Sequence, residues 1–270
     1  MKIISALAAV AALALAAAPS ALATTKSARS GNVKATLTYS GRYPNFGAER
    51  LTIRRAGKVY YSQPVVGPVC GRHCDPVAVG FADLEAPRQS DVVVELFTGG
   101  AHCCTIAQVF AYDPGTMTYT KRQHDFGDPG YRLSGLTHNG VDEFVTADDS
   151  FAYEFTDFAA SGLPIQILSF STGRFRNVTR SYPTLVANDA ATWLKAFDGM
   201  AKQHYSDSVG VIAAWAADED LLGNSQTVAT FLSQQAQEGH LKSALNPKES
   251  GQAFITALDT FLRKHGYLTG

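Results

Sequence analysis

The chain has 270 residues, of which 46% are hydrophobic and 17% are charged, and its formal net charge at pH 7 is −1. This length accommodates one large domain or two small ones, with enough apolar side chains for ordinary cores. The balanced charge provides no basic surface for nucleic acid or for anionic membranes, so neither partner is expected.

The first 23 residues have the features of a secretory signal. Lys2 precedes an apolar run from Ile3 to Pro19, and the run is followed by Ala21-Leu22-Ala23. A short apolar segment with a small-x-small ending is typical of a cleaved signal, and it is short for a membrane span. We therefore expect residues 1–23 to be a signal peptide. The mature protein is then secreted, periplasmic or held in the cell envelope, with no membrane span.

The next part of the chain has the pattern of antiparallel strands. Residues 24–32 are small and polar and are expected to form a flexible lead-in. Over residues 33–184, short runs rich in Val, Ile, Thr, Tyr and Phe are separated by Gly, Pro, Asp and Asn. The expected strands include KATLTYSG, DVVVELFTGG, CTIAQVFAYD, DEFVTADD, AYEF and PIQILSFS. Hairpin turns are expected at Ala56-Gly57, Asp113-Pro114-Gly115 and Thr172-Gly173.

Residues 185–270 change to helical periodicity. The expected helices lie in NDAATWLKAFDGMAKQHY, DSVGVIAAWAADEDLLG, NSQTVATFLSQQAQEG and PKESGQAFITALDTFLRKHGYL. The last of these carries one apolar stripe, made of Phe254, Leu258, Phe261 and Leu262. The expected fold class is α+β: a β-rich domain, resembling a partial propeller or a sandwich, over residues 33–184, followed by a small α-helical domain.

Two segments, ADLEAPRQSDVVVEL and SGLTHNGVDEFVTAD, align without gaps. In both, a leucine is followed seven residues later by an acidic residue that opens a strand: Leu84 with Asp91, and Leu136 with Glu143. Such a spacing indicates repeated, blade-like β units.

On these residues the chain resembles the FG-GAP or integrin-α-like (VCBS-type) repeats, whose loops carry D-x-D-G-D-G-x-x-E before a strand. The matching positions are Asp83, Glu85 and Asp91 in the first segment, and Asn139, Gly140 and Glu143 in the second. Ala86, Pro87 and Arg88 replace the central G-D-G. The resemblance implies the strand–loop–strand fold. The family's loops bind Ca²⁺, which takes about six to eight oxygens; too few carboxylates remain here, so no cofactor is expected.

The resemblance extends along most of the mature chain. With the run ELFTGGAHCCT and the helical tail, the sequence is similar to uncharacterised secreted bacterial proteins that carry degenerate repeats of this type. No activity follows from this resemblance.

Four cysteines in an exported chain are expected to form disulfides. Local pairing would join Cys70 to Cys74 and Cys103 to Cys104, the second pair as a vicinal ring. Such a ring would be a rigid, apolar surface that contains sulfur and suits a ligand. Crosswise pairing between the two pairs is the alternative; it is less favoured because neighbouring side chains on a strand point to opposite faces.

Metal and redox chemistry are further interpretations of the same residues. His73 and His102 with the four cysteines would suffice for Zn²⁺ or copper. Their spacings match no standard zinc motif, and an oxidising compartment favours disulfides. No C-x-x-C motif supports a redox centre, although a strained disulfide is reducible. No metal site is therefore expected.

The chain contains neither G-x-S-x-G nor H-E-x-x-H, and no catalytic residue is assigned. The leading hypothesis is a disulfide-stabilised, non-catalytic binding protein for an extracellular glycan or protein. Its expected ligand-binding residues are Gly99, Gly100, His102, Cys103, Cys104, Asp148 and Asp149. The alternatives are a secreted hydrolase that uses Asp148 and Asp149, and a structural envelope protein. Paired aspartates also commonly cap a turn.

Overall fold

The computed structural model describes residues 23–65, 67, 70, 74–203, 205, 207–245 and 249–268. The expected signal peptide, apart from Ala23, and His73 lie outside these residues. The described part contains three four-stranded antiparallel sheets followed by four α-helices, which confirms the expected α+β class and its order. Within that part, no helix is both long enough and apolar enough to cross a membrane.

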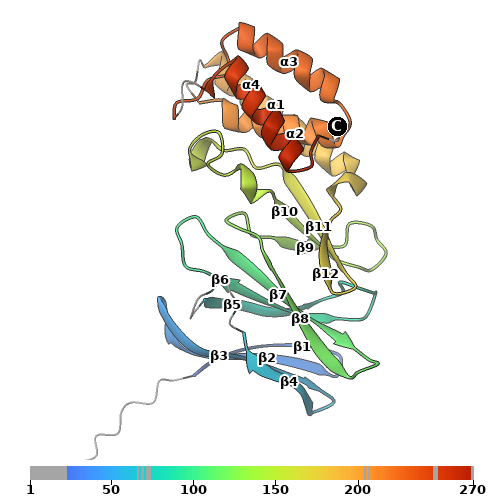
Figure 1. The fold of residues 1–270 in the computed structure, drawn as a ribbon. Coiled ribbons are helices and arrows are strands. Elements are labelled where there is room, and N and C mark those ends of the chain that lie inside the picture. Colours follow the sequence, from blue (N-terminus) through green and yellow to red (C-terminus); the bar gives the residue numbers. More distant parts are fainter. Residues whose placement is uncertain are drawn as a thin grey trace, which may run out of the picture.

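Each sheet is a meander of four consecutive strands. The first contains β1 (Thr24–Ser30), β2 (Val33–Arg42), β3 (Asn45–Arg55) and β4 (Lys58–Pro64). The second contains β5 (Asp75–Ala82), β6 (Asp91–Phe97), β7 (Thr105–Asp113) and β8 (Thr118–Asp125). The third contains β9 (Arg132–Ser134), β10 (Glu143–Ala147), β11 (Ile165–Ser171) and β12 (Arg174–Asn177). Figure 1 shows the sheets following one another in chain order, with the helices at the far end.

The expected flexible lead-in, residues 24–32, is instead mostly strand. β1 pairs with β2 along its whole length, from Thr24 opposite Tyr39 to Ser30 opposite Val33. Its side chains are exposed or half-buried, which suits an edge strand. Small polar residues therefore do not prevent pairing here, because β2 supplies the backbone partners and only one face needs cover.

The expected hairpin turns are confirmed. Ala56 and Gly57 join β3 to β4, and Thr172 and Gly173 join β11 to β12. All four have positive φ, at 45°, 83°, 50° and 69°, as two-residue turns between twisted strands require. Between β7 and β8, the carboxylate of Asp113 accepts the backbone N–H of Gly115 at 2.8 Å.

The expected strand AYEF is wrong. Residues 152–155 form turns between two short 3₁₀ segments, η1 (Asp149–Phe151) and η2 (Phe158–Ala160). Asp148 caps the first segment and Asp157 caps the second. Tyr153 has φ 62°, which no strand residue adopts. The capping aspartates thus override the β preference of the aromatic residues.

The second sheet is buried on both faces. Val92, Val94 and Leu96 of β6 pack towards the first sheet. Val93 of the same strand packs towards the third sheet, with Phe144 in that core. This explains the unbroken apolar run in DVVVEL, because a strand covered on both sides needs no polar face.

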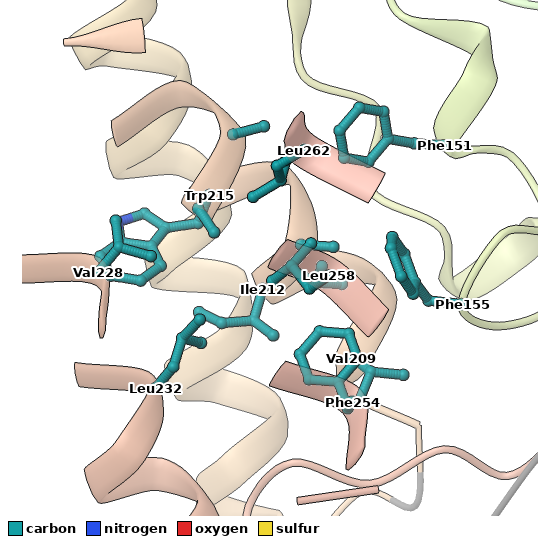
Figure 2. Packing of buried hydrophobic residues seen from close by; sticks show 14 of the residues in the cluster. Phe151, Phe155, Val209, Ile212, Trp215, Val228, Leu232, Phe254, Leu258 and Leu262 are labelled. Atoms are coloured by element: carbon teal, nitrogen blue, oxygen red, sulfur yellow. The ribbon is translucent and has the colours of Figure 1, made fainter. Parts of the chain in front are cut away.

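The helical part surrounds one central helix. The helices are α1 (Pro183–Lys202), α2 (Val209–Leu221), α3 (Ser225–Gln237) and α4 (Gln252–Lys264). α2 is buried on nearly every side, and the expected stripe of α4 is buried against it. Phe151 and Phe155, from the β-rich part, complete this core: Phe151 lies 4.8 Å from Phe261, and Phe155 lies 5.4 Å from Phe254, between ring centroids. Figure 2 shows both rings beside the helical side chains.

The two aligned loops play equivalent structural parts. Asp91 and Glu143 are the buried first residues of β6 and β10. Glu143 accepts the N–H of Leu136, seven residues earlier, at 3.0 Å. Asp91 lies fully buried seven residues after Leu84, and its burial raises its pKa to about 7. Each repeat loop thus ends in a buried acidic residue, and in the second loop that residue holds the loop through a hydrogen bond.

Candidate functional site

The loop between β6 and β7 carries the glycines, the histidine and two cysteines singled out from the sequence. Cys103 is joined to Cys104 across a cis peptide bond, and Cys70 is joined to Cys74, so the described cysteines pair locally. Gly99 has φ 90°, and a Cβ on it would lie 2.9 Å from the ring of Tyr43. The Tyr43 hydroxyl donates to the Gly99 carbonyl at 2.8 Å. The glycine therefore lets the hairpin β2–β3 close over this loop.

The Cys103–Cys104 pair faces the core more than the solvent. Cys104 is 8% exposed, Cys103 is half-buried, and both pack in the core between the first two sheets. This burial does not favour the hypothesis that the Cys103–Cys104 ring forms a ligand-binding surface. The exposed residues of the loop are Gly100, Ala101 and His102.

His102 lies against two aromatic rings of the 148–161 segment. Its ring is 4.1 Å from that of Phe158 and 6.5 Å from that of Tyr153, between centroids. The Tyr153 and Phe158 rings are 5.4 Å apart. Tyr153 is 57% exposed, while Phe158 is half-buried. We call His102, Tyr153 and Phe158 the aromatic rim.

Carboxylates lie next to the aromatic rim. Asp128, between β8 and β9, has its Oδ1 4.0 Å from Nδ1 of His102. Its backbone N–H donates to Oδ1 of Asp149 at 3.4 Å. Burial is the main cause that raises the pKa of Asp149, and the charges of Asp128, Asp125 and Asp148 raise it further. The rim therefore combines apolar ring faces with hydrogen-bond acceptors.

Asp148 and Asp149, predicted as one site, serve different partners. Asp148 accepts the N–H of Ser150 at 3.0 Å and the hydroxyl of Tyr267 at 2.7 Å, one bond on each carboxylate oxygen. It thus caps a turn and holds the C-terminal segment, which does not favour acid–base catalysis by this residue. Asp149 alone joins the surroundings of His102.

The segment that carries Tyr153 and Phe158 is firmly held. The Ser161 hydroxyl donates to the Asp157 carbonyl at 2.8 Å and accepts the N–H of Tyr153 at 3.1 Å. The hydroxyl of Thr156 donates to the buried Asp207. The aromatic rim is therefore built on a fixed loop, as a binding surface that needs little ordering on contact.

Sequence reasoning missed Tyr153, Phe158 and Asp128. The two aromatic residues were assigned to a strand and its flank, and Asp128 lies in a turn-like FGDPG run. A usable signal is the spacing of Asp148 and Asp157 before short 3₁₀ segments, since two capping residues nine positions apart indicate successive turns rather than a strand.

The disulfide pairing gives a direct prediction. Non-reducing peptide mapping of the purified mature protein should yield a Cys70–Cys74 peptide and a vicinal Cys103–Cys104 peptide, with four hydrogens fewer than the reduced mass, two for each bridge. A peptide that links Cys70 or Cys74 to Cys103 or Cys104 would contradict the local pairing. A bound metal ion in the native mass would contradict it as well.

Comparison with known proteins finds distant homologues. The chain is 27% identical over 192 residues to "Probable thylakoid lumen protein sll0997" of Synechocystis sp., covering 66% of this chain and 56% of the relative. It is 23% identical over 243 residues to "Uncharacterized protein y4bJ" of Sinorhizobium fredii, covering 84% of this chain and 37% of the relative. The chain thus spans less than two thirds of the length of both relatives.

No protein-family model matches the chain. No solved structure matches it either. The resemblance to FG-GAP-type repeats therefore remains a prediction, and it is the distant homology to proteins without a stated activity that the comparisons support.

Proposed function

We propose that the protein is an exported, non-catalytic binding protein whose aromatic rim takes a glycan outside the cytoplasm. The observation that carries the proposal is the cluster of His102, Tyr153 and Phe158 rings beside carboxylates. Sugar rings offer an apolar C–H face to aromatic side chains and hydroxyl donors to carboxylates, so this combination fits them.

The location outside the cytoplasm rests on three observations. The N-terminal sequence has the features of a secretory signal. The described cysteines are all paired in disulfides, which persist in oxidising compartments. One distant relative is named a probable thylakoid lumen protein.

In this proposal the three sheets are degenerate blades of a partial propeller, and they present the aromatic rim at one end.

The rim is tested by two alanine substitutions. Tyr153→Ala and Phe158→Ala should each weaken glycan binding about tenfold or more, because aromatic residues commonly dominate the energy of a binding surface. Binding would be measured on a glycan array and then by titration calorimetry with the best oligosaccharide. Tyr205→Ala is the matched control, since Tyr205 is 56% exposed and Tyr153 is 57% exposed.

Two outcomes would contradict the proposal. One is the absence of any glycan retained by the mature protein. The other is retention that Tyr153→Ala and Phe158→Ala leave unchanged. Capture of a protein partner that depends on Tyr153, with no glycan bound, would place a protein ligand on the rim instead.

A further inference from the structure

A cleft lies at the end of the first two sheets that is opposite to the aromatic rim. It has a volume of ≈ 530 Å³ and is lined by Asn32, Arg55, Arg88, Gln89, Ser90 and Tyr112, among others. The lining comes from the turns β1–β2, β3–β4 and β7–β8 and from the first repeat loop, all at the end where β6 begins. The aromatic rim lies at the opposite end, where β6 finishes. The volume is in the range of small-molecule sites. We call this the basic cleft.

We propose that the basic cleft binds an oxyanion, a carboxylate, sulfate or phosphate group, through the guanidinium groups of Arg55 and Arg88. The inference is independent of the proposed function, because it concerns a different end of the molecule.

Arg55 is held in position but keeps donors for a ligand. Its guanidinium carbon lies 3.9 Å from the ring centroid of Tyr112, and its Nη1 donates to the Tyr119 hydroxyl at 3.1 Å. A guanidinium has five N–H donors in a planar fork, so the others remain for an anion. A stacked arginine is also preorganised, which reduces the entropy lost when an oxyanion binds.

Neither arginine is neutralised by a carboxylate. Among the residues that the structure describes, no ion pair involves Arg55 or Arg88. The nearby carboxylates of Asp83 and Asp113 accept hydrogen bonds from backbone N–H and hydroxyl groups rather than from either guanidinium. Asp83 accepts the N–H of Arg88 at 2.8 Å and the hydroxyl of Ser90 at 2.8 Å. Asp113 accepts from Gly115 and Thr116, at 2.8 Å each. The described lining of the cleft contains these two arginines and no carboxylate, so it carries a positive charge that attracts an anion.

The backbone at Arg88 allows a glycine substitution that removes the side chain without strain. Arg88 has φ 62°, in the left-handed region that disfavours residues with a Cβ. The equivalent residue of the second repeat loop is Gly140, with φ 79°. Arg88 thus occupies a position where glycine fits better.

The test uses the full mature chain at low ionic strength, where charge attraction is least screened. Titration calorimetry would compare three probes: tetragalacturonate, its fully methyl-esterified form, and sodium sulfate. The variants are Arg88→Gly, which suits the positive φ, and Arg88→Lys, which keeps the charge. His138→Gly is the matched control, since His138 is exposed, has φ 53° and lies in the second loop.

The wild type should bind tetragalacturonate and not the neutral ester. Arg88→Gly should weaken that binding roughly tenfold, because hydrogen bonds to a charged group are lost. Arg88→Lys should retain part of it, and His138→Gly and Tyr153→Ala should change nothing. Sulfate binding with the same dependence on Arg88 would identify a free oxyanion as sufficient. Equal binding of the acid and its ester, no binding of any probe, or full binding by Arg88→Gly would overturn the proposal.

Discussion

Replacing Asp218 by asparagine is expected to raise the free energy of unfolding at pH 7 by roughly 2–4 kcal/mol. Asp218 lies in the last turn of α2 and is 0% exposed. Burial, and then the charge of Asp189, raise its pKa to about 10. Asp189 is fixed as an acceptor by the N–H of Ile165 at 2.8 Å and Nε1 of Trp193 at 2.9 Å. Asp218 is therefore a neutral acid in the folded protein at pH 7.

The dependence of folding stability on pH follows from the different protonation of Asp218 in the folded and unfolded states. Between the unfolded pKa of 3.8 and the folded pKa of about 10, the folded state keeps a proton that the unfolded state releases. Stability contributed by this group therefore falls as pH rises through that window, by up to about 1.4 kcal/mol per pH unit. Asparagine is uncharged in both states, so the variant should lose this slope.

The measurement is urea unfolding of wild type and variant at about pH 5, 7 and 9, at constant ionic strength. Asp259→Asn is the control, because Asp259 is 50% exposed and pairs with Arg263 four residues on. That exposed change should alter stability by about 0.5 kcal/mol or less. If Asp218→Asn is less stable than wild type at pH 9, the neutral, buried acid is the wrong description.

The second large effect is expected at Gly210, the second residue of α2. A Cβ at this position would fall closer than van der Waals contact to Cγ2 of Thr156 and to the carbonyl oxygen of Ala160. Because a backbone atom cannot move aside as a side chain does, Gly210→Ala should destabilise the protein by about 1–3 kcal/mol. It should also displace the segment that carries Tyr153 and Phe158.

Gly199 in α1 is the matched helical control, since nothing lies within 4 Å of the Cβ that alanine would add there. Gly199→Ala should stabilise the protein by about 0.5–1 kcal/mol through helix propensity alone. Thermal unfolding should show a lower melting temperature for Gly210→Ala and a higher one for Gly199→Ala. Equal shifts would mean that the loop and α2 are not in tight contact. Binding at the aromatic rim should weaken only in Gly210→Ala.

Periodicity predicted the elements that have one clear pattern. The stripe of α4 and the two-residue turns at Gly57 and Gly173 are confirmed, because helix faces and left-handed turn residues depend on nearby residues alone. β1 was missed because its residues are small and polar, while its pairing with β2 and its packing near β5 depend on residues distant in the sequence. α1 starts at Pro183, before the expected helical segment that begins at Asn188. Asp189 therefore lies inside the helix, where it accepts hydrogen bonds from Ile165 and Trp193.

The candidate site was only partly predictable. The loop with His102 was identified, because two glycines before a vicinal cysteine pair are unusual. The neighbours of His102 were not identified, because Tyr153 and Phe158 reach it only through the packing of their segment on α2. The burial of Cys104 could not be inferred either. It depends on which face of the loop the first sheet covers.

The link between Tyr267 and Asp148 has a consequence for synthesis of the chain. These residues are 119 positions apart, and Arg180 likewise donates to the carbonyl of Tyr267, 87 positions later, at 2.7 Å. A ribosome delivers the chain from its N-terminus, so the three sheets are complete long before these partners emerge. Until α4 arrives, Phe151 and Phe155 lack the rings that cover them. A nascent chain stopped after α3 would therefore expose both rings to the chaperones and proteases it meets.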